Sequence, residues 1–251
     1  MTAPRLFCFG LGYSACRLAL RLMSNGWQVA GTVRDKQNMR EIEGLGIEVF
    51  PFDREHPLEN PEAKLKSATH ILSSVPPDSD GDAVLDMHGQ TIADLGHTFK
   101  WVGYLSTTGV YGNRNGGMVR EGDALEPTSA RAHLRVKAEN LWLGLSAHIF
   151  RIAGIYGPGR GAIEDVRRGR AKRIDKPGQV FSRIHVDDLG RVLAASMATP
   201  NAGEVYNVCD DEPAAPMQVV TFACELLGVK PPPVQSFDLA KKEMSPMSLT
   251  F

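Results

Sequence analysis

A glycine-rich turn near the N-terminus constrains the fold of this chain more than any other feature. Residues 5–10 form a short apolar segment typical of a β-strand, and residues 13–24 have the apolar spacing of a helix. Between them Gly10 allows a tight turn, Gly12 allows a phosphate group to approach the backbone, and Ala15 allows the helix to pack closely on the strand. The sequence therefore predicts a dinucleotide-binding turn. The predicted contacts with the cofactor in this turn are Gly10, Gly12, Tyr13, Ser14 and Ala15.

The rest of the chain alternates between strand and helix patterns. Further strands are predicted at residues 28–33, 46–50, 70–75, 101–106, 148–152 and 205–208. Further helices are predicted at residues 36–44, 83–97, 130–145, 187–197 and 217–227. This alternation predicts an α/β protein, a Rossmann-like doubly wound parallel sheet. We expect a single NAD(P)-binding Rossmann domain over residues 1–251, in which residues from about 155 onwards contribute a small C-terminal substrate lobe.

Composition argues against several classes of partner. The 251 residues carry a formal net charge of −1 and no basic stripe, so neither nucleic acid nor a membrane surface is expected. No apolar run approaches the roughly 18 residues of a membrane helix, and the N-terminal run is too short for a signal peptide. The four cysteines are scattered, and no cluster has metal-ligand spacing. We therefore expect a cytoplasmic protein with reduced thiols, no metal and a small-molecule substrate.

The end of the second predicted strand indicates which dinucleotide binds. In NAD-binding proteins a carboxylate there accepts a hydrogen bond from the ribose 2′-hydroxyl. Here Val33 stands in the acidic position and Arg34 follows, whose planar fork suits the 2′-phosphate of NADP. Asp35 is a rival acceptor, so the sequence favours NADP and leaves NAD as an alternative. Asp53, after the third strand, is either a contact of the adenine amino group or a turn-forming residue.

Four later segments resemble the signatures of one enzyme family. They are residues 104–112 (YLSTTGVYG), 151–159 (RIAGIYGPG), 183–188 (RIHVDD) and 206–211 (YNVCDD). Together with the glycine-rich turn, and in this order, they resemble the extended short-chain dehydrogenases, the NAD-dependent epimerase/dehydratase family. The resemblance implies that Ile152 lies on the strand behind the nicotinamide. It also implies that Ser73, Ser74 and Val75 lie beside the cofactor at the end of the fourth strand.

The resemblance also implies a catalytic mechanism. In this family a Ser or Thr on the fifth strand binds the substrate hydroxyl, a Tyr four residues before a Lys takes its proton, and the Lys holds the cofactor ribose. Thr107 stands in the Ser/Thr place, with Ser106, a predicted cofactor contact, and Thr108 as neighbours that could serve instead. The Tyr-x-x-x-Lys segment reads from His133 to Lys137. A histidine therefore stands where the tyrosine is expected, which resembles the atypical subgroup that lacks the active-site tyrosine.

His133 leaves two alternatives open. Histidine titrates near neutrality, so His133 could exchange the proton of a substrate hydroxyl while Lys137, one helical turn further on, holds the ribose. This alternative predicts an NADP-dependent oxidoreductase or epimerase/dehydratase-like enzyme acting on a secondary alcohol, ketone or nucleotide sugar. In the other alternative His133 is a polar surface residue and the catalytic tyrosine is lost. The protein is then a catalytically inactive NAD(P)(H)-binding sensor or regulatory module.

The C-terminal half carries three further expectations. Basic residues follow residue 159, and they form a solvated helix face unless one of them holds an anionic substrate such as a nucleotide-sugar diphosphate. These residues are Arg160, Arg167, Arg168, Arg170, Lys172 and Arg173. The resemblance implies a homodimer formed through the helices at 83–97 and 130–145. It also implies a closing segment beyond Phe251.

Overall fold

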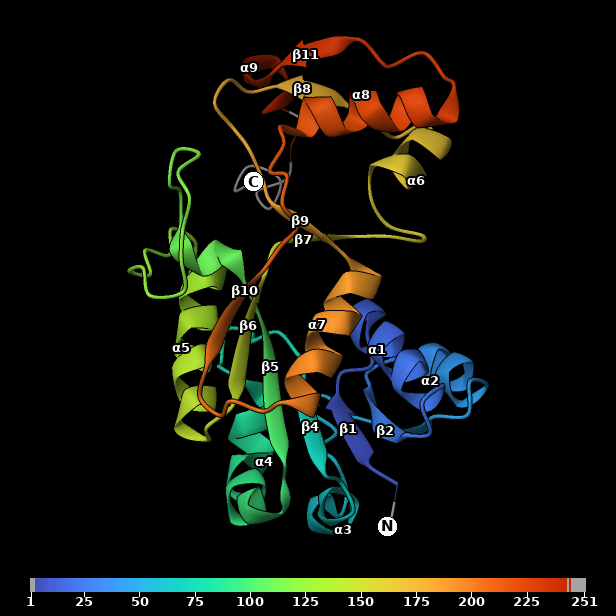
Figure 1. Ribbon diagram of the computed structural model, residues 1–251, viewed down its shortest axis with the longest axis vertical. Helices are drawn as coiled ribbons and strands as arrows, with labels where there is room; N and C mark the ends of the chain where they lie inside the picture. Colours follow the sequence, from blue (N-terminus) through green and yellow to red (C-terminus); the bar gives the residue numbers. More distant parts are fainter. Residues whose placement is uncertain (1–2, 243, 245–251) are drawn as a thin grey trace.

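The computed structural model describes residues 3–242 and 244 of the chain. In this described part, seven parallel strands form a central sheet with the order β10-β6-β5-β4-β1-β2-β3 (Figure 1). The strands are β1 (Arg5–Phe9), β2 (Gln28–Val33), β3 (Glu48–Pro51), β4 (His70–Ser73), β5 (Trp101–Thr107), β6 (His148–Ile152) and β10 (Val205–Val208). Most of their residues are buried, as expected for a parallel sheet that helices cover on both faces.

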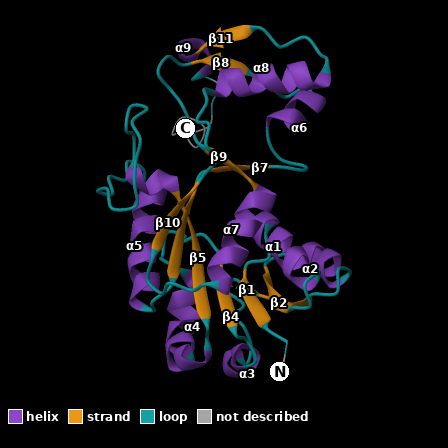
Figure 2. Ribbon diagram, in the orientation of Figure 1, coloured by secondary structure: helices purple, strands orange, loops and turns teal. Residues whose placement is uncertain are grey.

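Two layers of helices cover the sheet (Figure 2). One layer contains α1 (Tyr13–Met23), α2 (Lys36–Glu43) and α7 (Val186–Ala198), and the other contains α3 (Pro61–Lys66), α4 (Ala83–Asp94) and α5 (Ala130–Gly144). Helix α1 shows why these segments are helices. Its buried residues Ala15, Leu18, Ala19 and Leu22 follow the spacing that puts apolar side chains on one face. The predicted α/β, Rossmann-like, doubly wound fold is thereby confirmed.

The strand order places a crevice between β1 and β4. From β1 the chain builds the sheet outwards through β2 to β3, and then returns to add β4, β5 and β6 on the other side of β1. The order therefore reverses between β1 and β4, and ligands of open α/β sheets bind at the carboxyl ends of the strands at such a point. The glycine-rich turn follows β1, and Ser73 ends β4 opposite Phe9.

The residues after 153 divide between the sheet and a smaller group of elements at its carboxyl end. This group consists of α6 (Ala162–Arg167), β8 (Arg173–Asp175), α8 (Pro216–Leu227), β11 (Val234–Ser236) and α9 (Phe237–Ala240). The strands β7 (Gly154–Tyr156) and β9 (Arg183–His185) pair between this group and the sheet (Figure 1). By contrast, α7 packs on α1 and β10 pairs with β6, so both belong to the main body. A substrate lobe would therefore be formed by α6, α8, α9, β8 and β11 only.

The predicted and observed elements differ mainly at their ends and in the short segments. The helix predicted at 83–97 ends at Asp94, and a separate 3-10 turn spans Gly96–Thr98. The strand predicted at 70–75 ends at Ser73, and the Ser74 N–H group still donates to the Phe9 carbonyl oxygen of β1. Segments of three to six residues, such as α3, β7 and β11, contain too few residues to show a period. No described helix is both long and apolar enough to cross a membrane. The closing segment expected beyond Phe251 lies outside the described residues.

Candidate dinucleotide site

The glycine-rich turn has the geometry of a phosphate cradle. Gly10 has a φ of +85°, a left-handed conformation that favours glycine, and its N–H donates to Thr32 Oγ1 at 2.9 Å. A Cβ atom on Gly10 would lie 2.9 Å from Ser74 Oγ, so the protein itself excludes a side chain there. A Cβ atom on Gly12 would meet no protein atom within 4 Å. The absent side chain of Gly12 thus leaves open space beside the backbone, as a ligand that approaches the turn requires.

The N-terminus of α1 offers hydrogen-bond donors to this space. Gly12 is the N-cap residue of α1, and no side chain caps the helix. The first N–H group of the helix with a partner is that of Cys16, which donates to the Gly12 carbonyl oxygen at 2.9 Å. The N–H groups of Tyr13, Ser14 and Ala15 have no partner among the described residues. Together with the partial positive charge of a helix N-terminus, these groups fit a pyrophosphate.

Arg34 and its neighbours occupy the predicted ribose end of the site. Arg34 follows β2, is exposed, and makes no hydrogen bond or ion pair with a described residue. Asp35, the rival acceptor, is the N-cap residue of α2 and accepts a hydrogen bond from Gln37 N at 3.0 Å. The Asp35 carboxylate therefore already has a structural partner, whereas the Arg34 guanidinium is available to a ligand.

Asp53 forms a local turn after β3. One carboxylate oxygen, Oδ1, accepts from the N–H groups of Glu55 and His56 and contacts His56 Nδ1 at 2.9 Å. Burial acts to raise the pKa of Asp53, but these hydrogen bonds outweigh it and lower the pKa. The turn-forming alternative is thus present in the structure, and the adenine contact stays a prediction.

The end of β4 carries a buried hydroxyl without a partner. Ser73 is fully buried, and its Oγ atom has no hydrogen bond with any described residue. The Ser74 hydroxyl donates to the Gly10 carbonyl oxygen and so ties the end of β4 to the glycine-rich turn. Val75 is half-buried against the core beneath α4 and α5, and Ile152, at the end of β6, is buried. The predicted contacts Ser73, Ser74 and Val75 therefore lie beside the crevice between β1 and β4.

The end of β5 presents the predicted hydroxyl of Thr107. This residue is half-buried, and its Oγ1 atom accepts from Gly109 N at 3.2 Å, which leaves the hydroxyl proton available to a ligand. Ser106 is buried instead, and its hydroxyl donates to a carboxylate oxygen of Glu139. The structure therefore separates the two neighbours, since Ser106 is committed to an internal contact and Thr107 lies at the strand end.

Helix α5 turns the two remaining predicted catalytic residues away from the sheet. Its buried residues are Ala132, Arg135, Ala138, Glu139 and Trp142. At about 100° per residue, His133 and Lys137 lie on the opposite side of the helix, and both are exposed. His133 Nδ1 hydrogen-bonds the Ser129 carbonyl oxygen at 2.9 Å. His133 and Lys137 therefore do not face the sheet, and their roles in catalysis stay predictions, whereas Arg135 is the cation of α5 that does face the sheet.

A buried polar network lies beneath Thr107, and the sequence analysis missed it. Arg151 of β6 makes a salt bridge of 2.9 Å with Glu139, and it also donates to the Tyr111 hydroxyl at 2.8 Å. The Tyr111 hydroxyl in turn donates to Asn207 Oδ1 at 2.8 Å. The network therefore joins β6, α5, β10 and the 3-10 turn that follows Thr107 (Thr108–Tyr111). A signal was present in the sequence, because Tyr111, Arg151 and Asn207 each stand in one of the segments that resemble the enzyme family.

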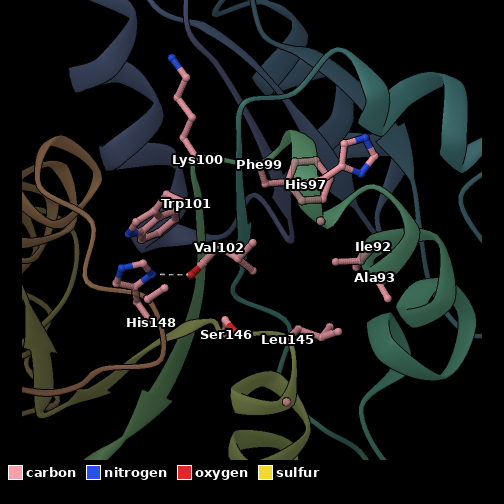
Figure 3. A pocket seen from close by; sticks show the side chains of 13 residues that line it. Ile92, Ala93, His97, Phe99, Lys100, Trp101, Val102, Leu145, Ser146 and His148 are labelled. Atoms are coloured by element: carbon pink, nitrogen blue, oxygen red, sulfur yellow. Dashed lines mark hydrogen bonds between the residues drawn. The ribbon is translucent and has the colours of Figure 1, made fainter.

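A separate cavity lies at the other edge of the sheet. It has a volume of about 440 Å³ and is lined by residues at the ends of α4 and α5 and at the starts of β5 and β6 (Figure 3). His148 in its wall hydrogen-bonds Val102 O through Nδ1 at 2.9 Å and accepts from Asn201 N through Nε2 at 2.9 Å. Burial lowers the pKa of His148, consistent with a neutral structural ring. We do not assign the dinucleotide to this cavity, because it lies at the amino ends of the strands. Among the described residues no group of His, Cys, Asp and Glu could hold a metal ion.

Comparison with solved structures identifies the class of fold. No family model matches the chain. Among solved structures, dTDP-glucose 4,6-dehydratase from Bacillus anthracis, in complex with NAD, has a TM-score of 0.75 and 17% identity, over 94% of this chain and 84% of that chain. UDP-glucose 4-epimerase from Thermus thermophilus, in complex with NAD, has a TM-score of 0.73 and 20% identity, over 92% of this chain and 85% of that chain. The fold is that of the NAD-dependent epimerase/dehydratase family, the extended short-chain dehydrogenases.

Two further proteins are more similar in sequence. The solved structure of a functionally unknown conserved protein from Silicibacter pomeroyi is 47% identical, with a TM-score of 0.90 over 99% of this chain and 86% of that chain. Protein YeeZ of Escherichia coli K12 is 27% identical over 236 residues, which are 89% of this chain and 84% of YeeZ. The chain therefore belongs to the same family as the Silicibacter pomeroyi protein.

Proposed function

We propose that the protein binds a nicotinamide dinucleotide between β1 and β4, and that it uses this cofactor in an oxidoreductase or epimerase/dehydratase-like reaction. The substrate class is a secondary alcohol, ketone or nucleotide sugar. The observation that carries the proposal is the phosphate cradle, in which three N–H groups of α1 lack a partner and no protein atom fills the space beside Gly12. The NAD complexes of enzymes with the same fold support the class of cofactor.

The chain's own residues have distinct roles in this proposal. The N-terminus of α1 holds the pyrophosphate, and Arg34 holds the 2′-phosphate of NADP. Thr107 donates a hydrogen bond from its free hydroxyl to the oxygen of the substrate alcohol or carbonyl and so orients that group. The nicotinamide, when bound, supplies the hydride acceptor or donor. Ser74 and the buried network position the two strand ends between which these groups meet.

Replacing Arg34 with glutamine tests the preference for NADP. A charge-assisted contact with the 2′-phosphate contributes about 1.5–3 kcal/mol, so R34Q is expected to raise the Kd for NADPH by about 10- to 100-fold. The Kd for NADH should not change, because NADH lacks that phosphate. Isothermal titration calorimetry measures both values, and R40Q, which removes an exposed arginine of α2, is the matched control. Equal NADPH affinity in R34Q and the wild type would contradict the role of Arg34.

A second candidate function is binding without turnover. The residues of α5 that face the sheet include neither a phenol nor an imidazole, and this observation favours a protein that senses the dinucleotide rather than one that transfers hydride. The two functions differ in one measurement. With NADPH bound, the enzyme would oxidise the cofactor when sugars or ketones are added, whereas the sensor would leave its absorbance at 340 nm, the reduced-nicotinamide band, constant.

The variant His133→Ala tests whether α5 has the same orientation in solution. Because His133 lies on the outer face, we expect this variant to keep the wild-type affinity for NADPH and any wild-type turnover. Calorimetry measures binding, and absorbance measures turnover. The substitution leaves the surroundings of Thr107 intact. A loss of kcat of about tenfold or more, with NADPH binding unchanged, would show that the imidazole takes part in the reaction.

A further inference from the structure

Arg135 is held at the end of β4 by two hydrogen bonds. Its Nη1 atom donates to the Tyr104 hydroxyl and to the Leu105 carbonyl oxygen, each at 2.9 Å. Tyr104 is the partner of Ser73 in the last residue pair of β4 and β5, and Leu105 lies one residue beyond that pair. The guanidinium therefore lies beside β5 at the level where β4 ends, and the buried Ser73 hydroxyl at that end has no partner among the described residues.

The protein offers the charge of Arg135 the ring of Tyr104, whose centre lies 5.5 Å from the guanidinium carbon, but no carboxylate of the described residues. Only 8% of the residue is exposed, yet it forms no ion pair with a carboxylate of the described residues. Arg151 offers a comparison within the same molecule, since it is 5% exposed and has a salt bridge with Glu139. Buried charges are almost always paired, because removal from water is costly. An unpaired buried arginine at the carboxyl ends of β4 and β5 is therefore the exception that needs a partner from outside the chain.

The unpaired part of Arg135 is the part that binds oxyanions. Nε and Nη2 make no hydrogen bond with a described residue. Neither atom is among the fully buried polar atoms that lack a partner, so both have contact with solvent. These two nitrogens form the edge of the guanidinium that binds a carboxylate or phosphate through two parallel hydrogen bonds. Because Nη1 is anchored, this edge is already oriented and loses little side-chain freedom on binding.

We propose that Arg135 binds an oxyanion, a carboxylate or phosphate group, of the molecule that enters the site at the carboxyl ends of β4 and β5. The proposal deepens the proposed function and rests on it for the identity of that molecule, because it makes the substrate of the dinucleotide-dependent reaction an anion. In this proposal α5 contributes to substrate binding although it lacks the catalytic tyrosine of the family. The sheet-facing side of the helix binds a negative group of the substrate, and the outer His133 and Lys137 take no part.

The test follows the Nε–H resonance of Arg135 by NMR in the full-length, nitrogen-15-labelled protein. The resonance is assigned by its absence from Arg135→Lys, and malonate and UDP are titrated separately as carboxylate and phosphate probes. We expect the resonance to shift and saturate with at least one probe. We also expect R135Q to weaken the binding of that probe by about tenfold or more. Lys137→Gln, which removes a cation from the outer face of the same helix, should bind both probes like the wild type.

The outcomes separate the possible sources of the oxyanion. If NADPH alone shifts the resonance and R135Q weakens NADPH binding, the oxyanion belongs to the cofactor and the substrate assignment is overturned. If the resonance does not move with malonate or UDP, or R135Q binds them like the wild type, the oxyanion site itself is overturned. Failure of the proposed function is a different result, namely a wild-type protein that does not bind NADPH. The wild-type titrations remain decisive even if R135Q does not fold.

Discussion

Replacing Glu139 with glutamine is expected to destabilise the protein by about 3–5 kcal/mol, because it leaves the positive charge of Arg151 buried without a carboxylate to balance it. The Arg151 side chain is only 6% exposed and that of Glu139 only 1%, so water cannot replace the lost carboxylate. Arg151 and Ser106 both donate hydrogen bonds to the same Glu139 carboxylate. The loss therefore affects β6, β5 and α5 together. Urea unfolding followed by circular dichroism measures the change in the free energy of unfolding.

An exposed ion pair of the same molecule provides the control. Arg191 and Asp188 form a salt bridge on the surface of α7, where both side chains are about half exposed or more. Arg191→Ala is expected to cost at most about 1 kcal/mol, because water screens such pairs. If E139Q unfolds within about 1 kcal/mol of the wild type, the buried pair is not the strong internal contact that its geometry indicates.

Replacing Gly12 with alanine is expected to weaken NADPH binding by about 100-fold without unfolding the protein. The φ of Gly12 is −87°, which alanine adopts freely, and an added Cβ would meet no protein atom within 4 Å. The methyl group would instead project into the space that a phosphate needs in order to reach the N–H groups of α1. Losing about two charge-assisted hydrogen bonds amounts to roughly 3 kcal/mol, or about two orders of magnitude in Kd.

Two further glycine variants, Gly144→Ala and Gly10→Ala, serve as comparisons for this result. Gly144, at the end of α5, also has no atom within 4 Å of an added Cβ, so its variant should fold and bind NADPH like the wild type. Gly10 has a positive φ and a crowded Cβ position, so its variant should lower the melting temperature as well as the affinity. Calorimetry and thermal unfolding of the three variants separate effects on the cofactor from effects on the fold. Wild-type affinity in Gly12→Ala would place the dinucleotide elsewhere.

The features that could be predicted from sequence are those with a local physical cause. The strand, glycine-rich turn and helix from β1 to α1 follow from short-range periodicity and from the need for glycine at Gly10. The strands at 28–33, 148–152 and 205–208 have the predicted bounds, because each is an apolar run bounded by turn residues. Thr107 was placed by the family resemblance of residues 104–112, and it is the last residue of β5, one residue beyond the predicted strand. The right-handed connections of alternating strands and helices then leave few possible sheet orders.

The orientation of α5 could not be predicted in this way. The helix carries two polar rows at four-residue spacing, one with His133 and Lys137 and one with Arg135 and Glu139. Polarity alone predicts that neither row is buried, and Leu141, which would be expected to face the core, is exposed. The second row is buried because Arg151, from the next strand, supplies the opposite charge for Glu139. A contact between different elements therefore decided which row faces the sheet.

By itself, the amino-acid sequence determined the class of fold, the turn that would hold a pyrophosphate and the hydroxyl at the end of β5, since each depends on residues close together in the chain. Only the tertiary structure decided which cation of α5 faces the sheet, which carboxylates are already engaged and which hydroxyl is internal. These properties depend on burial and on partners distant in sequence, as Ser106 with Glu139 and Arg135 with Tyr104 show. The free energy of a charged group depends on what surrounds it, and that environment exists only in the folded protein.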